Sequence, residues 1–459
     1  MAVYAQSAPH WHHQKDNVIR ASFINVESGK TFNQGSATLD VNGRQFRENM
    51  THGYAHFRFL GGDNTARLTF NEGEKNISSD FSVPPATTTI FTIPEVDLRR
   101  DEEERKRNVI PIWEGEDTIE VIPGSGEISR GLSNRVYFIT KRKGVPTPMT
   151  FRVLSHEGNA DKIPETITSN AFGLASIAIR PVTSLRFELQ SEGEHTGKGK
   201  INLFAIATQF AFELQEPFVR YGQRIQARVE SVRQSGTILV DAYQQDRWVS
   251  AEVFGLDKKG SHFNIKAAAQ GQLMQVQVYN NFYRVGSSWS SQWVAIGEKN
   301  EESCSVFRKL SAHLKDVPET QWSTQVAEKD IFQTATHRQC ENLLSALLAS
   351  IPISFVNSTT ILNSREHDLK TLNSWKEDKK SMLLWITALL FGGGFCVLLW
   401  LVLNGVKKQR TFDSLLQEDE EAMMPKDRFE TLLITLRVVI ILSALATFIA
   451  SILMVMSFM

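Results

Sequence analysis

Three histidines near the start of the chain form its densest group of side chains able to bind a metal ion. They lie in the segment Pro9-His-Trp-His-His13, and their neutral imidazoles could bind Zn²⁺ or Cu²⁺. No cysteine or acidic residue stands nearby at the spacing of a metal site. We therefore predict no metal and no other cofactor, and keep His10, His12 and His13 as the candidates should a metal bind.

The sequence lacks the short motifs that mark common active sites. It contains no H-E-x-x-H, no G-x-S-x-G, and no glycine-rich fingerprint of a nucleotide-binding loop. We predict that the protein is not an enzyme, and the remaining catalytic alternative is a metal-dependent enzyme built on the N-terminal histidines. The net charge of −1 shows no basic excess, so we expect no nucleic-acid partner.

Aromatic side chains are frequent between residues 248 and 293. Trp289 and Trp293 stand in the polar, turn-like stretch Gly-Ser-Ser-Trp-Ser-Ser-Gln-Trp, a few residues after Tyr283. Exposed aromatic rings of this kind can stack on a sugar or a peptide. The alternative is that loop tryptophans are tucked into a sandwich core, so these three residues are candidates for ligand binding and for core packing alike.

The chain has three cysteines. Cys396 lies inside a long apolar run, whereas Cys304 and Cys340 lie outside it. The latter two could form a disulfide if the compartment is oxidising, and two free buried thiols are the alternative. Three cysteines are too few for a disulfide-dense secreted scaffold.

Two long uncharged runs dominate the last eighty residues. Residues 381–403 and 438–459 carry no Asp, Glu, Lys or Arg, and a bilayer core requires about 20 apolar residues in a helix. Both runs are therefore predicted to be transmembrane helices that anchor the chain in a lipid bilayer. The loop between them, residues 404–437, is rich in positive charge (Lys407, Lys408, Arg410, Lys426, Arg428 and Arg437).

Short loops rich in Lys and Arg stay in the cytoplasm. The loop 404–437 is accordingly predicted to be cytoplasmic, and the large N-terminal region is predicted to be periplasmic or extracellular. Small residues recur within the two runs and would let helices approach closely. They would pack the two helices on each other or on another membrane subunit (Gly392, Gly393, Gly394, Ser443, Thr447 and Ser451).

The region before residue 299 shows short alternating runs separated by turn signals. Strands of about six residues with frequent turns are typical of β-sandwiches. Asn42-Gly43 predicts a tight hairpin, because this pair tolerates the positive φ that matches strand twist. We predict a mainly β fold: a flexible N-terminus or signal-peptide remnant (1–16), sandwiches at 17–94, 109–207 and 208–298, and a charged linker at 95–108.

One motif recurs in the first two of these blocks. Residues 51–59 and 168–179 both read T…G-x-A-x-Φ-x-Φ, where Φ is apolar: a glycine turn followed by a strand with one buried face. This pattern resembles the strand entry of bacterial immunoglobulin-like, carboxypeptidase-regulatory-like and macroglobulin-like domains, and the likeness covers residues 17–298. No Gly-Cys-Gly-Glu-Gln thioester motif is present, so the resemblance implies a fold and not proteinase trapping.

The pattern becomes helical after Glu301. Val306, Leu310 and Leu314 recur four residues apart, and an apolar face continues to Ser350, where Pro352 follows. We predict that residues 299–380 form a helical neck leading to the membrane, packed on itself or on a partner.

These features together predict a membrane-anchored envelope protein. Its immunoglobulin-like domains would serve as a scaffold or docking subunit for other envelope or membrane proteins. The alternative is an adhesin-like surface protein that binds a glycan or a peptide through the aromatic residues of the third sandwich.

Overall fold

The computed structural model confirms a mainly β fold and divides the chain into two units, 1–365 and 366–459. The predicted linker 95–108 lies outside the described residues, which are 2–7, 11–12, 16–28, 30–60, 65–72, 75–82, 86–87, 112–161, 163–193, 197–206, 210–232, 236–244, 247–256, 261–266, 273–280, 289–353, 355–356, 358–416 and 438–440.

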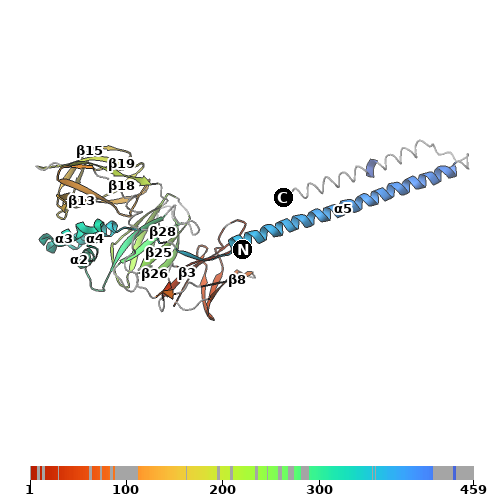
Figure 1. Ribbon diagram of the computed structural model, residues 1–459, viewed down its shortest axis with the longest axis horizontal. Coiled ribbons are helices and arrows are strands. Elements are labelled where there is room, and N and C mark those ends of the chain that lie inside the picture. Colours follow the sequence, from red (N-terminus) through yellow and green to blue (C-terminus); the bar gives the residue numbers. More distant parts are fainter. Residues whose placement is uncertain are drawn as a thin grey trace. The chain divides into compact units, whose positions relative to one another are not determined.

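The first sandwich consists of two four-stranded antiparallel sheets (Figure 1). Its core lies between them, and Phe23 stacks on Phe70 across the two sheets, with ring centroids 4.5 Å apart. The predicted hairpin is confirmed, since Asn42 and Gly43 have φ of 53° and 79°. One sheet has the order β30 (Thr359–Asn363), β1 (Ala2–Ser7), β3 (Asp16–Ile24), β6 (Tyr54–Leu60), and the other β5 (Arg44–Asn49), β4 (Ser36–Val41), β7 (Thr65–Glu72), β8 (Lys75–Ser82).

Both ends of the first unit contribute a strand to this sandwich. Ala2–Ser7, predicted to be flexible or the remnant of a signal peptide, form strand β1, and all six residues are buried. Strand β1 lies between β3 and β30, so its backbone is hydrogen-bonded on both sides. The structure thus corrects the prediction of a flexible N-terminus for residues 2–7, and it moves residues 359–363 from the predicted helical neck into the first sandwich.

The second sandwich packs two sheets around a separate apolar core. The glycine motif is confirmed here, because Gly173 has φ of 77° and directly precedes a strand. One sheet has the order β10 (Ile112–Glu114), β20 (Lys198–Leu203), β19 (Leu185–Ser191), β15 (Thr150–Glu157), β17 (Thr166–Thr168), and the other β11 (Asp117–Pro123), β13 (Asn134–Arg142), β18 (Leu174–Pro181), β16 (Ala160–Asp161). Short pairs add β14 (Val145–Pro146) beside β13, and β12 (Ile128–Ser129) beside β21 (Ala205–Ile206).

The third sandwich has one small and one large sheet. The small sheet contains β22 (Phe210–Leu214), β24 (Arg224–Ser231) and β27 (Ser261–Lys266). The large sheet has the order β23 (Phe218–Arg220), β29 (Trp289–Gly297), β28 (Leu273–Tyr279), β25 (Thr237–Gln244), β26 (Arg247–Gly255). Seven of the eight residues of β25 are buried, so this sheet is covered on both faces.

Three helices follow: α2 (Ser303–His313), α3 (Gln321–Ala327) and α4 (His337–Ser350), with the 3-10 turns η1 (Pro318–Thr320) and η2 (Asp330–Thr334) between them. A capping box begins α4, in which the Thr336 hydroxyl accepts from the Gln339 amide and the Gln339 side chain accepts from the Thr336 amide. A disulfide joins Cys304 to Cys340, so it ties the first turn of α2 to α4.

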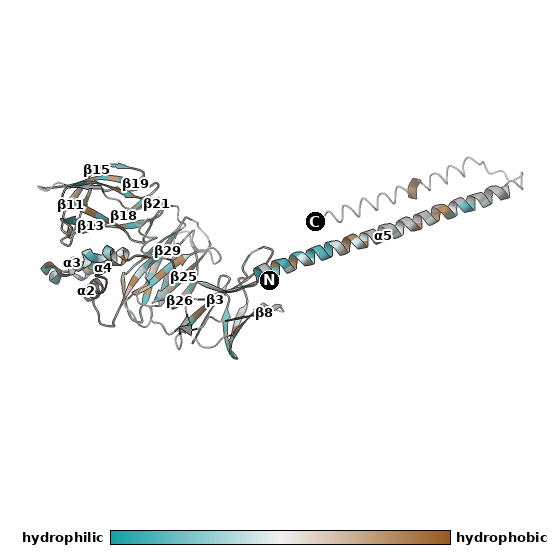
Figure 2. Ribbon diagram, in the orientation of Figure 1, coloured by the Kyte–Doolittle hydropathy of each residue, from teal (hydrophilic) through white to brown (hydrophobic). Residues whose placement is uncertain are grey.

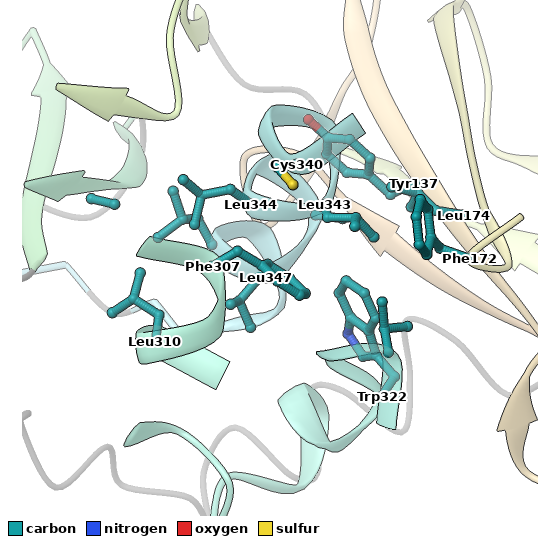
Figure 3. Close-up of a cluster of buried hydrophobic side chains, with 14 of the residues drawn as sticks. Tyr137, Phe172, Leu174, Phe307, Leu310, Trp322, Cys340, Leu343, Leu344 and Leu347 are labelled. Atoms are coloured by element: carbon teal, nitrogen blue, oxygen red, sulfur yellow. The ribbon is translucent and has the colours of Figure 1, made fainter. Parts of the chain in front are cut away.

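The apolar faces of these helices are buried against both neighbouring sandwiches. Trp322 and the leucines of α4 point into one cluster with Tyr137, Phe172 and Leu174 of the second sandwich (Figure 3). Phe218 and Ala295 of the third sandwich belong to the same cluster. Residues 303–350 are therefore a packed joint between sandwiches, which corrects the prediction of a neck leading straight to the membrane.

Helix α5 (Arg365–Leu416) begins two residues after β30 ends. Its first turns are hydrophilic, and it continues beyond 403 into the segment that was predicted to be a loop (Figure 2). No helix among the described residues combines the length and apolarity needed to cross a membrane. The membrane helices 381–403 and 438–459 thus stay a prediction. Gly392, Gly393 and Gly394 lie in α5, whereas Ser443, Thr447 and Ser451 lie outside the described residues.

Candidate functional site

The outer face of the large sheet of the third sandwich carries polar and charged side chains that are buried. In β25 the core-facing residues Val240 and Ala242 alternate with the outward residues Asp241 and Tyr243. Strand β28 presents Gln277 and Tyr279 outward in the same way, and the side chains of these four outward residues are buried as well. Two parts of the chain cover this face, and each makes specific contacts.

The first covering part is the β3–β6 side of the first sandwich. Arg20 reaches from β3 to form an ion pair with Asp241, and both side chains are 0% exposed. Its Nη1 also donates to the Tyr279 hydroxyl at 2.5 Å, and that hydroxyl donates to Asp241 Oδ2 at 2.6 Å. Arg20 Nε donates to His56 Nε2 at 2.8 Å. We call Arg20, His56, Asp241 and Tyr279 the ionic clamp.

Aromatic rings surround the guanidinium of the clamp. The Arg20 Cζ lies 4.9 Å from the centre of the Trp248 ring, and Trp248 stacks on Tyr243 with centroids 5.9 Å apart. A desolvated cation over an aromatic face gains about 2 kcal/mol. The guanidinium thus has a carboxylate, a phenol, an imidazole and an indole face as partners.

The electrostatics of the clamp favour a single arrangement of charges. Burial would lower the pKa of Arg20, but Asp241 and the neighbouring tyrosines together outweigh it and hold that pKa above its ordinary value. Burial raises the pKa of the Asp241 carboxyl, and Arg20 opposes that rise. Burial, with the cations Arg20 and Arg58 nearby, holds the pKa of His56 well below its usual range. His56 is therefore neutral and accepts the Arg20 hydrogen bond.

This arrangement suits a joint between domains and not a reaction centre. General acid–base chemistry requires a reacting group within hydrogen-bond reach of the catalytic side chain. Arg20 and Asp241 are 0% exposed, and the Tyr279 hydroxyl is already bound to both of them. The clamp therefore fixes the first sandwich on the third.

The second covering part is an extended segment of the chain itself, which we call the strap: the described residues 352–353, 355–356 and 358–363. Trp293 Nε1 donates to the Pro352 carbonyl at 3.2 Å. The Gln277 amide makes two hydrogen bonds of 3.0 Å to the backbone of Val356, one donated and one accepted. A side-chain amide used in this way imitates a neighbouring β-strand.

Aromatic contacts and strand pairing complete the hold on the strap. The Phe355 ring meets Tyr279 edge-on at 5.3 Å and Trp289 at 5.5 Å. Beyond it, β30 pairs with β1 in antiparallel register, and the Tyr4 and Thr360 hydroxyls lie 2.8 Å apart. The strap is thus held as a peptide ligand would be, by backbone hydrogen bonds, one aromatic anchor and an added strand.

The structure places the predicted site residues as follows. Trp289 and Trp293 lie within strand β29 and are half-buried against the strap, as the core-packing alternative predicted, and ligand binding by these two residues stays a prediction. Tyr283 lies outside the described residues. His12 belongs to β2 (Trp11–His12), which pairs with β9 (Ala86–Thr87), whereas His10 and His13 lie outside the described residues. The described residues contain no group of His, Cys, Asp or Glu able to hold a metal.

Sequence reasoning missed the clamp residues. Their signal was present, because Arg20 and Asp241 are each the single charged residue of a largely apolar stretch, VIRASFI and TILVDAY. Charged residues are almost never fully buried unless they are paired. Two such residues of opposite sign in different domains were therefore candidates for a mutual ion pair.

The fold and the covered sheet define a protein of tandem two-sheet β-sandwiches, the architecture of immunoglobulin-like domains. No protein-family model and no curated protein matches the chain. Among solved structures it is similar to alpha-2-macroglobulin of Salmonella reacted with methylamine, with 8% identity and a TM-score of 0.18. It is also similar to invasin, a bacterial integrin-binding protein, with 11% identity and a TM-score of 0.16. Each match covers 64% of this chain, but 23% of the macroglobulin and 60% of invasin.

Proposed function

We propose that the protein is a non-enzymatic, membrane-anchored envelope protein whose sandwiches serve as a scaffold or docking subunit outside the cytoplasm. The observation that carries this proposal is the way the three sandwiches are joined. The clamp fixes the first sandwich to the third, and the apolar cluster of helices α2–α4 fixes the third to the second. A fixed joint suits a protein that holds a surface in a set position for its partners.

The attachment to a bilayer is supported by the sequence and exposure of α5. The helix follows β30 after the single residue Ser364 and contains the uncharged run 381–403. Large apolar side chains in this run are exposed, including Trp385 at 69% and Leu389 at 72%. Large apolar surfaces left exposed mark contacts with a membrane or a protein. Trp375 and Trp385 fit the aromatic belt at a bilayer surface.

The outward orientation of the first unit is supported by the disulfide. Disulfides persist in the periplasm and outside the cell and are rare in the cytosol. Cys304 and Cys340 are joined on the N-terminal side of α5. The Lys- and Arg-rich segment 404–437 lies on the other side of the run, and it is the part we propose to be cytoplasmic.

The experiment that tests this proposal is labelling of single cysteines in intact cells. In a Cys396→Ser background, Gln417→Cys reports the proposed cytoplasmic side and the exposed position Lys143→Cys reports the sandwiches. An impermeant thiol reagent should label position 143 in intact cells and position 417 only after lysis. Labelling of both or neither position in intact cells refutes the orientation, and extraction of the protein by alkaline carbonate refutes the anchor.

The alternative is a surface protein that binds a ligand through the third sandwich, and the contacts of the strap limit which ligand that could be. Trp289 and Trp293 already contact the strap, so a glycan would have to displace it. The Gln277 contacts are made to a peptide backbone, and this favours an extended peptide over a glycan as ligand. Binding of oligosaccharides by the full chain, lost in Trp289→Ala, would restore the glycan alternative.

A further inference from the structure

The joint between the first and third sandwiches contains a histidine within reach of water. His56 lies on β6, the edge strand of its sheet, and it is half-buried. Histidine is the side chain that ordinarily changes its charge near neutral pH. We propose that His56 is a proton-sensitive switch: when it takes up a proton, the first sandwich loosens its hold on the third, and the joint opens while both sandwiches stay folded.

Protonation of His56 removes the hydrogen bond that joins it to Arg20. The two residues lie directly opposite each other on β6 and β3, and Arg20 Nε donates to His56 Nε2 at 2.8 Å. A protonated imidazole carries a hydrogen on both of its nitrogens, so it cannot accept this bond. Two cations would then face each other at the distance of a hydrogen bond, and their repulsion is strong where water is excluded.

Arg20 cannot relieve this repulsion while the joint is closed. Its side chain is 0% exposed and is held by Asp241 and by the Tyr279 hydroxyl, both of the third sandwich. Asp241 balances one positive charge, and Arg58 adds a further cation near His56. A charged His56 therefore leaves an excess positive charge in a buried site, which is unfavourable until the sandwiches separate and water reaches it. The open joint binds the proton more readily than the closed joint.

The other ionisable groups of this joint do not reproduce the effect. Burial raises the pKa of Asp241, so its protonation favours the closed joint and opposes the action of His56. Arg58 pairs with Glu252 of β26 at 3.9 Å, but both side chains are 44% exposed, so water screens this pair. The phenols stay neutral because burial raises the pKa of each of them: Tyr54, Tyr243 and Tyr279.

The reactivity of a buried cysteine measures the opening of the joint. Ser22 lies two residues from Arg20 on the same face of β3 and is 0% exposed, so Ser22→Cys reacts with a thiol reagent when the joint opens. The variant is made in a Cys396→Ser background and studied as the full chain in detergent. Its rate is divided by that of the exposed Lys143→Cys at the same pH, which removes the pH dependence of the thiol itself. Ser311→Cys is the matched control, because Ser311 is 1% exposed but lies in α2.

The expected result is a rise in labelling that depends on His56. The open joint gives His56 its ordinary pKa of about 6.5, so the opening equilibrium should increase about tenfold from about pH 7.5 to about pH 5.5. The corrected rate of Ser22→Cys should therefore rise about tenfold more than in the same protein with His56→Gln. Glutamine still offers Arg20 an acceptor and takes up no proton. His52→Asn, at an exposed histidine with φ of 50°, should keep the rise.

A second reporter guards against a variant that disturbs the joint by itself. Ala251→Cys on β26 repeats the measurement from the third sandwich, where Ala251 is 4% exposed and packs in one cluster with Val18 of β3. If neither reporter shows a rise that His56→Gln abolishes, or if Ser311→Cys rises equally, the proposal is overturned. The measurement needs neither the anchor nor the orientation of the proposed function, so the labelling test in cells can fail independently.

Discussion

Replacing Asp241 by asparagine should strongly destabilise the protein. Asparagine keeps the shape of the side chain and removes its charge, so the Arg20 guanidinium stays buried without a counter-ion. Both side chains are 0% exposed, so water cannot screen the loss. The other neighbours cannot replace the carboxylate, because His56 is neutral and the Tyr279 hydroxyl carries no charge.

The size of the effect follows from this burial. Removing one partner of a fully buried ion pair costs about 3–5 kcal/mol, whereas replacing both partners by apolar residues of similar volume is often neutral. The free energy of unfolding should therefore fall by about 3–5 kcal/mol in Asp241→Asn and recover in the double variant Arg20→Met/Asp241→Leu. A double-mutant cycle built from Arg20→Met, Asp241→Leu and the double variant that combines them then gives the coupling between the two residues.

The assay is urea unfolding of the full-length protein in detergent, with hydrogen exchange to locate the change. Peptides from β3 and β25 should lose protection first, because these strands carry the pair. Asp80→Asn is the matched control: Arg67 binds Asp80 through two hydrogen bonds of 2.6 and 3.0 Å, but these side chains are 61% and 68% exposed. A shift in Asp241→Asn no larger than in Asp80→Asn would refute the reasoning.

Three further predictions follow from the same structure. The pKa of His56 is held low in the folded protein, so the unfolded chain binds an extra proton below about pH 6.5; the free energy of unfolding should fall as the pH drops below that value, and His56→Gln should flatten the profile. The disulfide closes a loop with a sequence separation of 36, so the free energy of unfolding of Cys304→Ser/Cys340→Ser should fall by about 4 kcal/mol. Hydrogen exchange should become faster in α2–α4 and stay unchanged in the clamp. A Cβ on Gly173 would lie 2.7 Å from a backbone nitrogen at φ of 77°, whereas Gly144 at φ of 78° has open space, so Gly173→Ala should lower the melting temperature more than Gly144→Ala.

Local signals in the sequence were sufficient to predict individual strands and turns. The glycine of the recurring motif opens β6 at Gly53 and β18 at Gly173, both with positive φ. The Asn42-Gly43 turn and the helical period after Glu301 also depend on neighbouring residues alone. Each of these features is encoded within a few residues, so a sequence pattern can reveal it.

No local sequence signal predicted that the two ends of the first unit pair with each other. Strand β1 pairs with β30, and the hydrogen bond from Val3 to Ser364 joins residues 361 positions apart. Residues 359–363 form a short segment of mixed polar and apolar residues, and they follow a helical pattern. The helical period was therefore extended through them, and they were predicted to belong to the neck. Pairing over this distance is decided by which sheet edge is open, and that depends on the whole fold.

The large sheet of the third sandwich is covered by the first sandwich, so these two tandem sandwiches share a buried interface. Alternation in β25 predicts one apolar face and one polar face, and a polar face is normally exposed to water. Here Asp241 on the polar face is buried, because Arg20 from the first sandwich meets it. Burying this carboxylate without its partner would be unfavourable, so the first sandwich can cover this face only with Arg20 placed against Asp241. The ion pair therefore sets how the first sandwich meets the third.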